Sequence, residues 1–191
     1  MMRIITGTAR GAKLQAPAGE HTRTTAERTK EAVFSMLADR VAGRRVLDLF
    51  GGSGQLGLEC ISRGASSAVI VDNDKAAVQV IRENARHTKL ADRTEIVQTA
   101  ALGFLKAYSG APFGLIFLDP PYATTLVREC LAVIAARGLL SMGGTVVCET
   151  ASPEAVFGGD AQLEALYSCR RRARYGAAHV AILGHAEEEL A

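Results

Sequence analysis

Metal ligands and membrane-spanning segments are scarce in this sequence. Its 191 residues include only four cysteines and four histidines, with no C-x-x-C pair and no histidine at ligand spacing, so we expect no bound metal. No apolar run approaches the roughly 20 residues that cross a bilayer. The first residues lack the apolar core of a signal peptide. We therefore expect a cytoplasmic protein that has no membrane partner and acts as a monomer.

Internal repeats, linkers and low-complexity segments are absent as well. The length suits one domain with a sizeable core, and 48% hydrophobic with 22% charged residues exclude a disordered or fibrous protein. Nineteen glycines against five prolines suit a fold with many tight turns between strands and helices. Three cysteines lie in apolar stretches and are expected to be small buried hydrophobic side chains: Cys60, Cys130 and Cys148.

The net charge of +2 is distributed unevenly. Residues 1–45 contain nine Lys and Arg against four acids, and a second basic cluster consists of Arg170, Arg171, Arg172 and Arg174. A basic N-terminal segment beside a near-neutral body fits an arm that contacts phosphate groups, although a solvated charged face has the same composition. We divide the chain into a basic arm or hairpin (1–23), a main domain (24–185) and an acidic tail (186–191).

Apolar segments and helical patterns alternate through most of the chain. Thr24 and Glu27 have the spacing of a capping box and predict a helix over 25–41. Strands are then expected at 46–50, 68–72, 94–98, 114–119 and 144–149, and helices at 56–63, 75–87 and 124–137. Such alternation predicts a parallel sheet covered on both faces. The last two expected strands, 163–174 and 178–184, form a hairpin, which would add an antiparallel edge.

The first expected strand ends in a glycine-rich turn, Asp48-Leu49-Phe50-Gly51-Gly52-Ser53-Gly54. Glycines let the backbone turn tightly and approach a ligand, and in open α/β sheets ligands bind at this edge. Residues 52–57 match G-x-G-x-x-G, and Asp72 lies 20 residues after Gly52, as a dinucleotide site requires. An S-adenosylmethionine site also combines a glycine turn with an acid after the second strand, which binds the two ribose hydroxyls. Asp48 favours this second site, because a carboxylate pairs with the cationic methionine moiety but gains nothing from a pyrophosphate.

The fourth expected strand ends in Asp119-Pro120-Pro121-Tyr122. Two consecutive prolines stiffen the backbone and remove two N–H donors, which leaves carbonyl groups to accept. The Asp119 carboxylate and the Pro120 carbonyl can accept both hydrogens of an amino group on a planar ring, and Tyr122 can stack on that ring. This arrangement directs the nitrogen lone pair at a methyl donor, and an in-line transfer needs orientation but no metal. We therefore assign Asp119, Pro120, Pro121 and Tyr122 as the candidate catalytic residues.

Together the two motifs favour a methyltransferase that acts on the exocyclic amino group of a nucleic-acid base. The base must lie outside a stack, either flipped or in a loop. A DNA adenine-N6 methyltransferase keeps the same chemistry, but the chain has no separate domain for reading DNA sequence. A nicotinamide-dependent oxidoreductase would need a proton donor, and no histidine constellation or Tyr-x-x-x-Lys pair is present. A pure RNA-binding module would leave both motifs without a role.

The whole chain resembles the RsmD family, bacterial methyltransferases of guanine N2 in small-subunit ribosomal RNA. The resemblance starts at Arg3-Ile4-Ile5-Thr6-Gly7 and continues through Arg10-Gly11-Ala12-Lys13-Leu14 and Arg23-Thr24-Thr25. The glycine turn and Asp119-Pro120-Pro121-Tyr122 follow in the family's order, and the similarity ends at Arg174-Tyr175-Gly176. It implies a Rossmann-like class I S-adenosylmethionine methyltransferase fold. Such a fold has a seven-stranded, mostly parallel sheet with an antiparallel C-terminal hairpin, here with a small N-terminal extension.

The resemblance also implies a substrate and a set of contacts. The substrate would be a guanine in a hairpin loop of 16S rRNA on an assembling small subunit. Contacts to S-adenosylmethionine are expected from Asp48, Phe50, Gly51, Gly52, Gly54, Asp72, Asn73 and Ala100. Contacts to RNA are expected from Arg10, Lys13, Arg23 and Arg28. The chain departs from the family pattern where Thr24 replaces a proline, Gly52 an alanine, and Ala100 an acid near the adenine.

Overall fold

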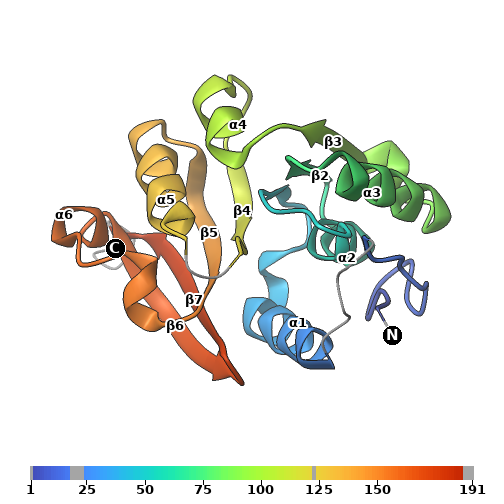
Figure 1. The fold of residues 1–191 in the computed structure, drawn as a ribbon, viewed down its shortest axis with the longest axis horizontal. Coiled ribbons are helices and arrows are strands. Elements are labelled where there is room, and N and C mark those ends of the chain that lie inside the picture. Colours follow the sequence, from blue (N-terminus) through green and yellow to red (C-terminus); the bar gives the residue numbers. More distant parts are fainter. Residues whose placement is uncertain (1, 18–23, 122–123, 187–191) are drawn as a thin grey trace. The chain divides into compact units, whose positions relative to one another are not determined.

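A computed structural model describes residues 2–17, 24–121 and 124–186, without the side chains of 24–27. The chain forms two compact units, Met1–Ala101 and Leu102–Ala191 (Figure 1). Several predictions fall outside the described part of the chain: the capping box of Thr24 and Glu27, the roles of Arg23 and Tyr122, and the acidic tail from residue 187 onward.

The first unit is built on three parallel strands in the order β3-β2-β1. Their bounds are β1 (Arg45–Asp48), β2 (Ser67–Asp72) and β3 (Thr94–Gln98). Helix α2 (Gln55–Ser62) packs against β1 and β2, and helix α3 (Lys75–His87) packs against β2 and β3. A short 3-10 helix, η2 (Ala91–Arg93), leads into β3. The predicted parallel alternation is confirmed here, and the strand 94–98 and the helix 75–87 have the predicted bounds.

Helix α3 shows why its bounds could be predicted. The Asp74 side chain caps its first turn by accepting a hydrogen bond from the Ala76 N–H at 2.9 Å. A buried stripe follows at helical spacing and includes Val78 and Ile81. At the other end the Thr88 hydroxyl donates to the Asn84 carbonyl at 2.7 Å. The N-terminal cap, the buried stripe and the C-terminal hydrogen bond are all formed by residues in the helix or next to it.

The predicted helix over 25–41 is too long. Helix α1 spans Thr24–Leu37, and a 3-10 turn, η1 (Ala38–Arg40), follows it. Ala38 has a φ of +43°, in the left-handed region that an α-helix cannot contain. The apolar periodicity continues to Val41, which is buried, but the backbone beyond Leu37 is no longer α-helical.

The N-terminal segment, residues 2–17, folds back on itself within the first unit. Arg3 and Lys13 form an antiparallel bridge, and the Ile4 N–H donates to the Ala12 carbonyl at 2.9 Å. Ile4 and Leu14 are buried, so the segment contributes to the core of this unit. The basic side chains of the segment therefore extend from a packed element.

The second unit has four strands in the order β4-β5-β7-β6. Their bounds are β4 (Phe113–Leu118), β5 (Leu140–Thr150), β6 (Tyr167–Tyr175) and β7 (Ala178–His185). The β4–β5 pair is parallel, whereas β7 is antiparallel to both β5 and β6. The helices are α4 (Ala101–Ala107), α5 (Leu126–Ala136), the 3-10 helix η3 (Pro153–Val156) and α6 (Ala161–Glu164). The seven strands and the antiparallel C-terminal hairpin confirm the expected fold class.

Two local predictions in this unit are corrected, and one helix had no prediction. Helix α4 was not predicted. Strand β5 begins at Leu140 instead of residue 144, with a register irregularity against β4 before Leu115. The strand predicted from residue 163 begins at Tyr167, because the Asp160 carboxylate accepts from the Leu163 N–H at 3.0 Å and starts helix α6 there.

The cysteine prediction is confirmed. Cys60, Cys130 and Cys148 are fully buried free thiols. Burial raises the pKa of Cys130 to about 12 and the pKa values of Cys60 and Cys148 well above their usual range.

Within the described ranges, no three His, Cys, Asp or Glu side chains group as metal ligands, and no helix could cross a membrane.

Candidate functional site

The glycine turn leads from β1 into helix α2, and its hydrogen bonds attach it to the end of β2. The Gly51 N–H donates to the Val71 carbonyl at 2.9 Å, and the Gly52 N–H donates to the Asp72 carboxylate at 2.8 Å. A Cβ on Gly51 would lie 2.6 Å from the Ile70 Cγ2, so only glycine allows this close approach. Gly54, at a φ of +78°, turns the chain into helix α2. These contacts hold the turn rigidly against the carboxyl ends of β1 and β2.

Asp72 closes the turn from the β2 side. One carboxylate oxygen accepts from Gly52, and the other accepts from the Asp74 N–H at 2.8 Å. A carboxylate has about four lone-pair sites, so two hydroxyl groups could still be bound. The next strand reaches the same edge, where the Thr99 N–H donates to the Asp72 carbonyl at 3.0 Å. Asn73 and Ala100, both exposed, therefore flank Asp72 at this edge.

Asp48 is a buried carboxylate with one oxygen unsatisfied. Its Oδ2 accepts from the Gly57 N–H at 3.1 Å, but its Oδ1 has no hydrogen-bond partner among the described residues. Burial raises the pKa of Asp48 to about 6, the backbone N–H groups of Gly57 and Phe50 lower it, and the Asp72 charge raises it further. A buried acceptor without a partner costs about 1–3 kcal/mol. A cationic ligand at the turn would remove that penalty.

Asn84 connects the glycine turn to the N-terminal segment. Its side-chain amide is buried and donates to the Ser53 carbonyl at 2.8 Å and to the Gln15 carbonyl at 2.9 Å. Its Oδ1 accepts from the Gln15 N–H at 2.8 Å. The sequence signal was present, since Asn84 is a polar residue on the apolar stripe of helix α3. Its two partners, however, lie 31 and 69 residues away.

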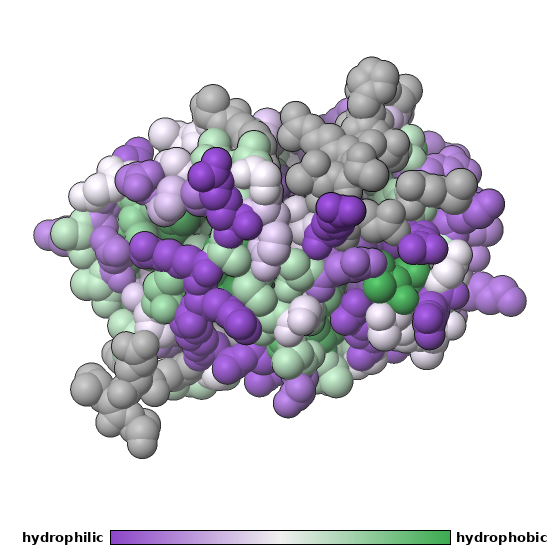
Figure 2. Space-filling view, turned by 90° about the horizontal axis from the view of Figure 1, so that it is seen from below, coloured by the Kyte–Doolittle hydropathy of each residue, from purple (hydrophilic) through white to green (hydrophobic). Residues whose placement is uncertain are grey.

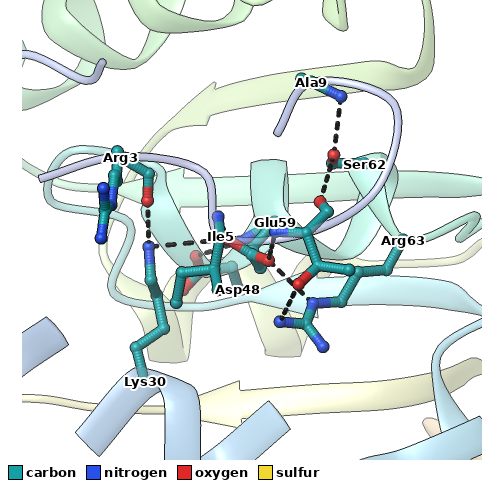
Figure 3. A network of polar contacts seen from close by, with 10 residues as sticks. Arg3, Ile5, Ala9, Lys30, Asp48, Glu59, Ser62 and Arg63 are labelled. Carbon is teal, nitrogen blue, oxygen red and sulfur yellow. Dashed lines mark hydrogen bonds and ion pairs between the residues drawn. The ribbon is translucent and has the colours of Figure 1, made fainter. Parts of the chain in front are cut away.

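A second buried side chain, Glu59 on helix α2, holds the start of the N-terminal segment (Figure 3). Its two oxygens accept from the Ile5 N–H at 2.8 Å and the Thr6 N–H at 3.0 Å. Arg63 Nε donates to the same carboxylate at 2.8 Å, and Lys30 Nζ lies 3.6 Å from it. The glutamate is completely buried, so these contacts replace its entire hydration.

Two further contacts extend this network. Lys30 Nζ donates to the Arg3 carbonyl at 2.6 Å. The Ser62 hydroxyl donates to the Thr6 carbonyl at 2.6 Å and accepts from the Ala9 N–H at 2.9 Å. Glu59, Ser62 and Asn84 together secure the N-terminal segment along most of its described length. Our sequence analysis assigned none of them a role.

The side chains predicted to contact RNA are exposed where they are described. Arg10 and Lys13 extend from the N-terminal segment that Glu59 and Ser62 hold, and Arg28 extends from helix α1. Arg3, which lies across from Lys13, is also exposed. These cations are thus on preformed backbone, which lowers the entropy lost when a polyanion binds.

The second unit carries the Asp-Pro-Pro segment. Asp119 follows directly after β4 and is half-buried, Pro120 is buried and Pro121 is exposed. The Thr124 hydroxyl donates to the Pro121 carbonyl at 3.1 Å. At the strand end, Leu118 pairs with Cys148 of β5. Asp119 is therefore at the carboxyl edge of this unit's parallel pair, the edge at which ligands bind in such sheets.

Comparison with known proteins gives a consistent result. The family model described as conserved hypothetical protein 95 matches residues 2–184. Ribosomal RNA small subunit methyltransferase D of Escherichia coli is 35% identical over 149 residues, which are 78% of this chain and 74% of that protein. The Haemophilus influenzae protein of the same name is 32% identical over 151 residues, 78% of each chain.

Solved structures agree with the sequence relatives. A structure from Escherichia coli assigned as methyltransferase yhhF has a TM-score of 0.82 at 30% identity and covers 96% of this chain and 97% of its own. The hypothetical protein TTHA0928 of Thermus thermophilus has a TM-score of 0.76 at 31% identity, with 95% and 98% covered. TrmN from Thermus thermophilus, at 23% identity and a TM-score of 0.71, shares the fold.

Proposed function

Because the chain belongs to the RsmD family of methyltransferases, we propose that it methylates the exocyclic N2 of a guanine in 16S rRNA. The target would lie in a hairpin loop of an assembling small subunit in the cytoplasm, and the methyl donor would be S-adenosylmethionine. The observation that carries the choice of donor is the buried Asp48 carboxylate, whose Oδ1 has no partner among the described residues. A dinucleotide would bring more negative charge to that carboxylate, whereas S-adenosylmethionine brings a cation.

The residues at the edge of the first unit fit this cofactor. Asp48 would face the cationic methionine moiety, and Asp72 would accept from the ribose hydroxyls while it holds Gly52. Gly51, Gly52 and Gly54 would let the backbone approach the ligand, with Phe50, Asn73 and Ala100 beside it. When bound, the cofactor supplies an electrophilic methyl group on a sulfonium.

The Asp-Pro-Pro-Tyr segment would hold the guanine. Asp119 and the Pro120 carbonyl accept the two hydrogens of the amino group, Pro121 keeps the turn stiff, and Tyr122 stacks on the base. This arrangement would direct the nitrogen lone pair at the methyl group that the cofactor supplies, and the Asp119 carboxylate would accept the surplus proton of the amino group. Arg10, Lys13, Arg23 and Arg28 contact phosphates around the loop.

The experiment that tests this function is methyl transfer from labelled S-adenosylmethionine to several acceptors in parallel. They are unmethylated small subunits, naked 16S rRNA, duplex DNA and a protein extract, and mass spectrometry identifies the product. We expect N2-methylguanine in the small subunit. N6-methyladenine in DNA would keep the mechanism but refute the substrate. Tight binding of a nicotinamide nucleotide without any methyl transfer would refute the cofactor.

Replacement of Asp72 should weaken cofactor binding. Asp72→Ala removes the expected ribose contacts and also the acceptor for the Gly52 N–H, so we expect at least a tenfold higher Kd for S-adenosylmethionine, which corresponds to about 1.4 kcal/mol. Asp74→Ala is the matched control, because it removes a neighbouring exposed carboxylate that only caps helix α3. Calorimetric titration of both variants measures the effect. Equal affinities for the two variants would show that Asp72 does not bind the cofactor.

Cofactor binding should depend on pH through Asp48. Its pKa of about 6 means that the empty site is largely protonated at pH 5, and a bound cation lowers that pKa. Binding below pH 6 must then release a proton, so affinity should fall about tenfold from pH 7 to pH 5. The stability of the ligand-free protein should show the opposite pH dependence. Because the pKa of Asp48 is higher in the folded than in the unfolded state, the free energy of unfolding should increase as pH falls from 6 towards 4.

Calorimetry in buffers of different ionisation enthalpy detects that proton release directly. Asp48→Asn should bind the cofactor more weakly and without this pH dependence. A wild-type affinity that stays constant between pH 5 and pH 7 would show that Asp48 does not face the cationic moiety.

A further inference from the structure

The second unit contains a cavity that the proposed contacts leave unused. It has a volume of about 220 Å³ and lies between the end of β5, helix η3 and the β6–β7 hairpin. Val156, Val180 and Ala181, all buried side chains, are among its apolar lining residues. Pockets for drug-sized ligands have about 300–1,000 Å³. The smaller cavity here suits one planar base better than a complete nucleotide cofactor.

Polar side chains from the hairpin also line the cavity. They are Arg172, Arg174 and His179. Arg172 and Arg174 are two residues apart on β6, so their side chains share one face of the strand. Each guanidinium has five N–H donors, and the local contacts engage only part of them: Arg172 Nε donates to Cys169 Sγ at 3.1 Å, and Arg174 Nε donates to the Gly176 carbonyl at 3.0 Å.

Two acids near this pair, Glu164 and Glu154, are exposed, so water screens their charges. Arg172 Nη2 lies 3.9 Å from Glu164 with both side chains about half exposed, and an exposed pair at that distance contributes little. Glu154 on helix η3 is fully exposed, and its pKa is lowered first by the Ser152 hydroxyl and to a smaller extent by the charges of His179 and Arg172. This end of the second unit shows hydrophilic surface interleaved with hydrophobic surface (Figure 2). An apolar cavity beside exposed arginines is complementary to a nucleotide, which has an apolar base face and an anionic phosphate.

Strand register places the cavity relative to Asp119. Leu118 on β4 pairs with Cys148 on β5, so the next residues, Asp119 and Glu149, lie at the same level. Glu149 pairs with Val180 on β7, and Val180 pairs with Ala173 on β6. Neighbouring strands lie about 4.8 Å apart, so Val180 on β7 is about 10 Å from the level of Asp119 along this line. That separation is short enough for adjacent nucleotides of a splayed loop to reach both places.

We propose that this cavity binds an unpaired RNA nucleotide that flanks the methylated base. The base lies on the apolar lining and against His179, and its phosphate contacts Arg172 and Arg174. This inference rests on the proposed function, and it gives the β6–β7 hairpin a role in substrate binding. The cavity would select a loop over a duplex, because only an unpaired base can enter it.

Kinetics with small subunits test the proposal. Arg172→Ala and Arg174→Ala should each raise KM for the RNA about fivefold to tenfold and reduce the slope of log affinity against log salt by about 1. Neither should change kcat or the Kd for S-adenosylmethionine. Arg171→Ala is the matched control, because it removes an exposed arginine from the opposite face of the same strand and should have little effect.

An abasic nucleotide separates base binding from general charge. His179→Ala should raise KM about fivefold on a normal loop but have no further effect on a loop whose flanking base is removed. If the unsubstituted enzyme methylates its substrate and all three variants match it, the arginines only protect the sheet edge and this inference is wrong. If the unsubstituted enzyme methylates no RNA, the proposed function itself fails.

Discussion

We expect Asp119→Ala to abolish methyl transfer and to leave S-adenosylmethionine binding within about twofold of the unsubstituted enzyme. Asp119 follows β4 in the second unit, whereas the glycine turn and Asp72 belong to the first. Its expected role is to accept one hydrogen of the guanine amino group and to direct the nitrogen lone pair. Loss of one such orienting contact lowers kcat by about 10²–10³-fold or more.

Two further variants make this prediction specific. Asp119→Asn keeps a carbonyl acceptor of the same size but loses the charge, so its activity should lie between those of the alanine variant and the unsubstituted enzyme. Asp92→Ala removes an exposed carboxylate from η2 and should change nothing. Single-turnover transfer measures the chemical step, and calorimetry measures cofactor binding. Full activity of Asp119→Ala would refute the role assigned to the Asp-Pro-Pro-Tyr segment.

Glu59→Ala should destabilise the fold by about 3–5 kcal/mol, the range seen when one partner of a buried ion pair is removed. The side chain is completely buried, and its loss leaves the Ile5 and Thr6 N–H groups without their acceptor and the buried Lys30 ammonium without the carboxylate of its ion pair. The N-terminal segment should then separate from helix α2. Urea unfolding measures the stability, and trypsin cleavage at Arg10 and Lys13 should accelerate as the segment is released.

The control for Glu59 is Glu83→Ala on helix α3, whose carboxylate accepts from Gln79 at the surface and should contribute less than about 0.5 kcal/mol. A double variant, Glu59→Gln with Lys30→Met, should recover part of the lost stability, because it no longer leaves a buried ammonium without its carboxylate. If Glu59→Ala is no less stable than Glu83→Ala, the buried network does not hold the segment.

The N-terminal segment therefore differs from a flexible basic tail. Glu59 secures Ile5 and Thr6 near its start, and Asn84 secures Gln15 towards its end. Asn84 also holds the Ser53 carbonyl of the glycine turn. The segment that is proposed to meet RNA and the turn that is proposed to meet the cofactor thus share one buried amide.

The sequence by itself determined the elements whose causes are local. Helix α3 has its cap at Asp74 and its apolar stripe within 14 residues, and the predicted bounds were correct. The glycine turn, the Asp-Pro-Pro segment and the three buried cysteines were also identifiable, because residue type and immediate neighbours specify them. Local signals failed where they competed: Asp160 caps a short helix in a segment whose apolar residues had predicted a strand.

Only the tertiary structure decided which polar groups meet. Glu59 and Asn84 are ordinary helical residues in the sequence, and the backbone groups that they bind lie between 31 and 69 positions away. Arg170 belongs to the basic cluster in the sequence, yet it donates to the Gly144 carbonyl and the Thr145 hydroxyl, while Arg172 and Arg174 line the cavity. The register irregularity between Cys169 and Arg171 produces this division. Propensity and capping act over a few residues, whereas pairing partners depend on how distant strands and helices pack, and no local pattern records that.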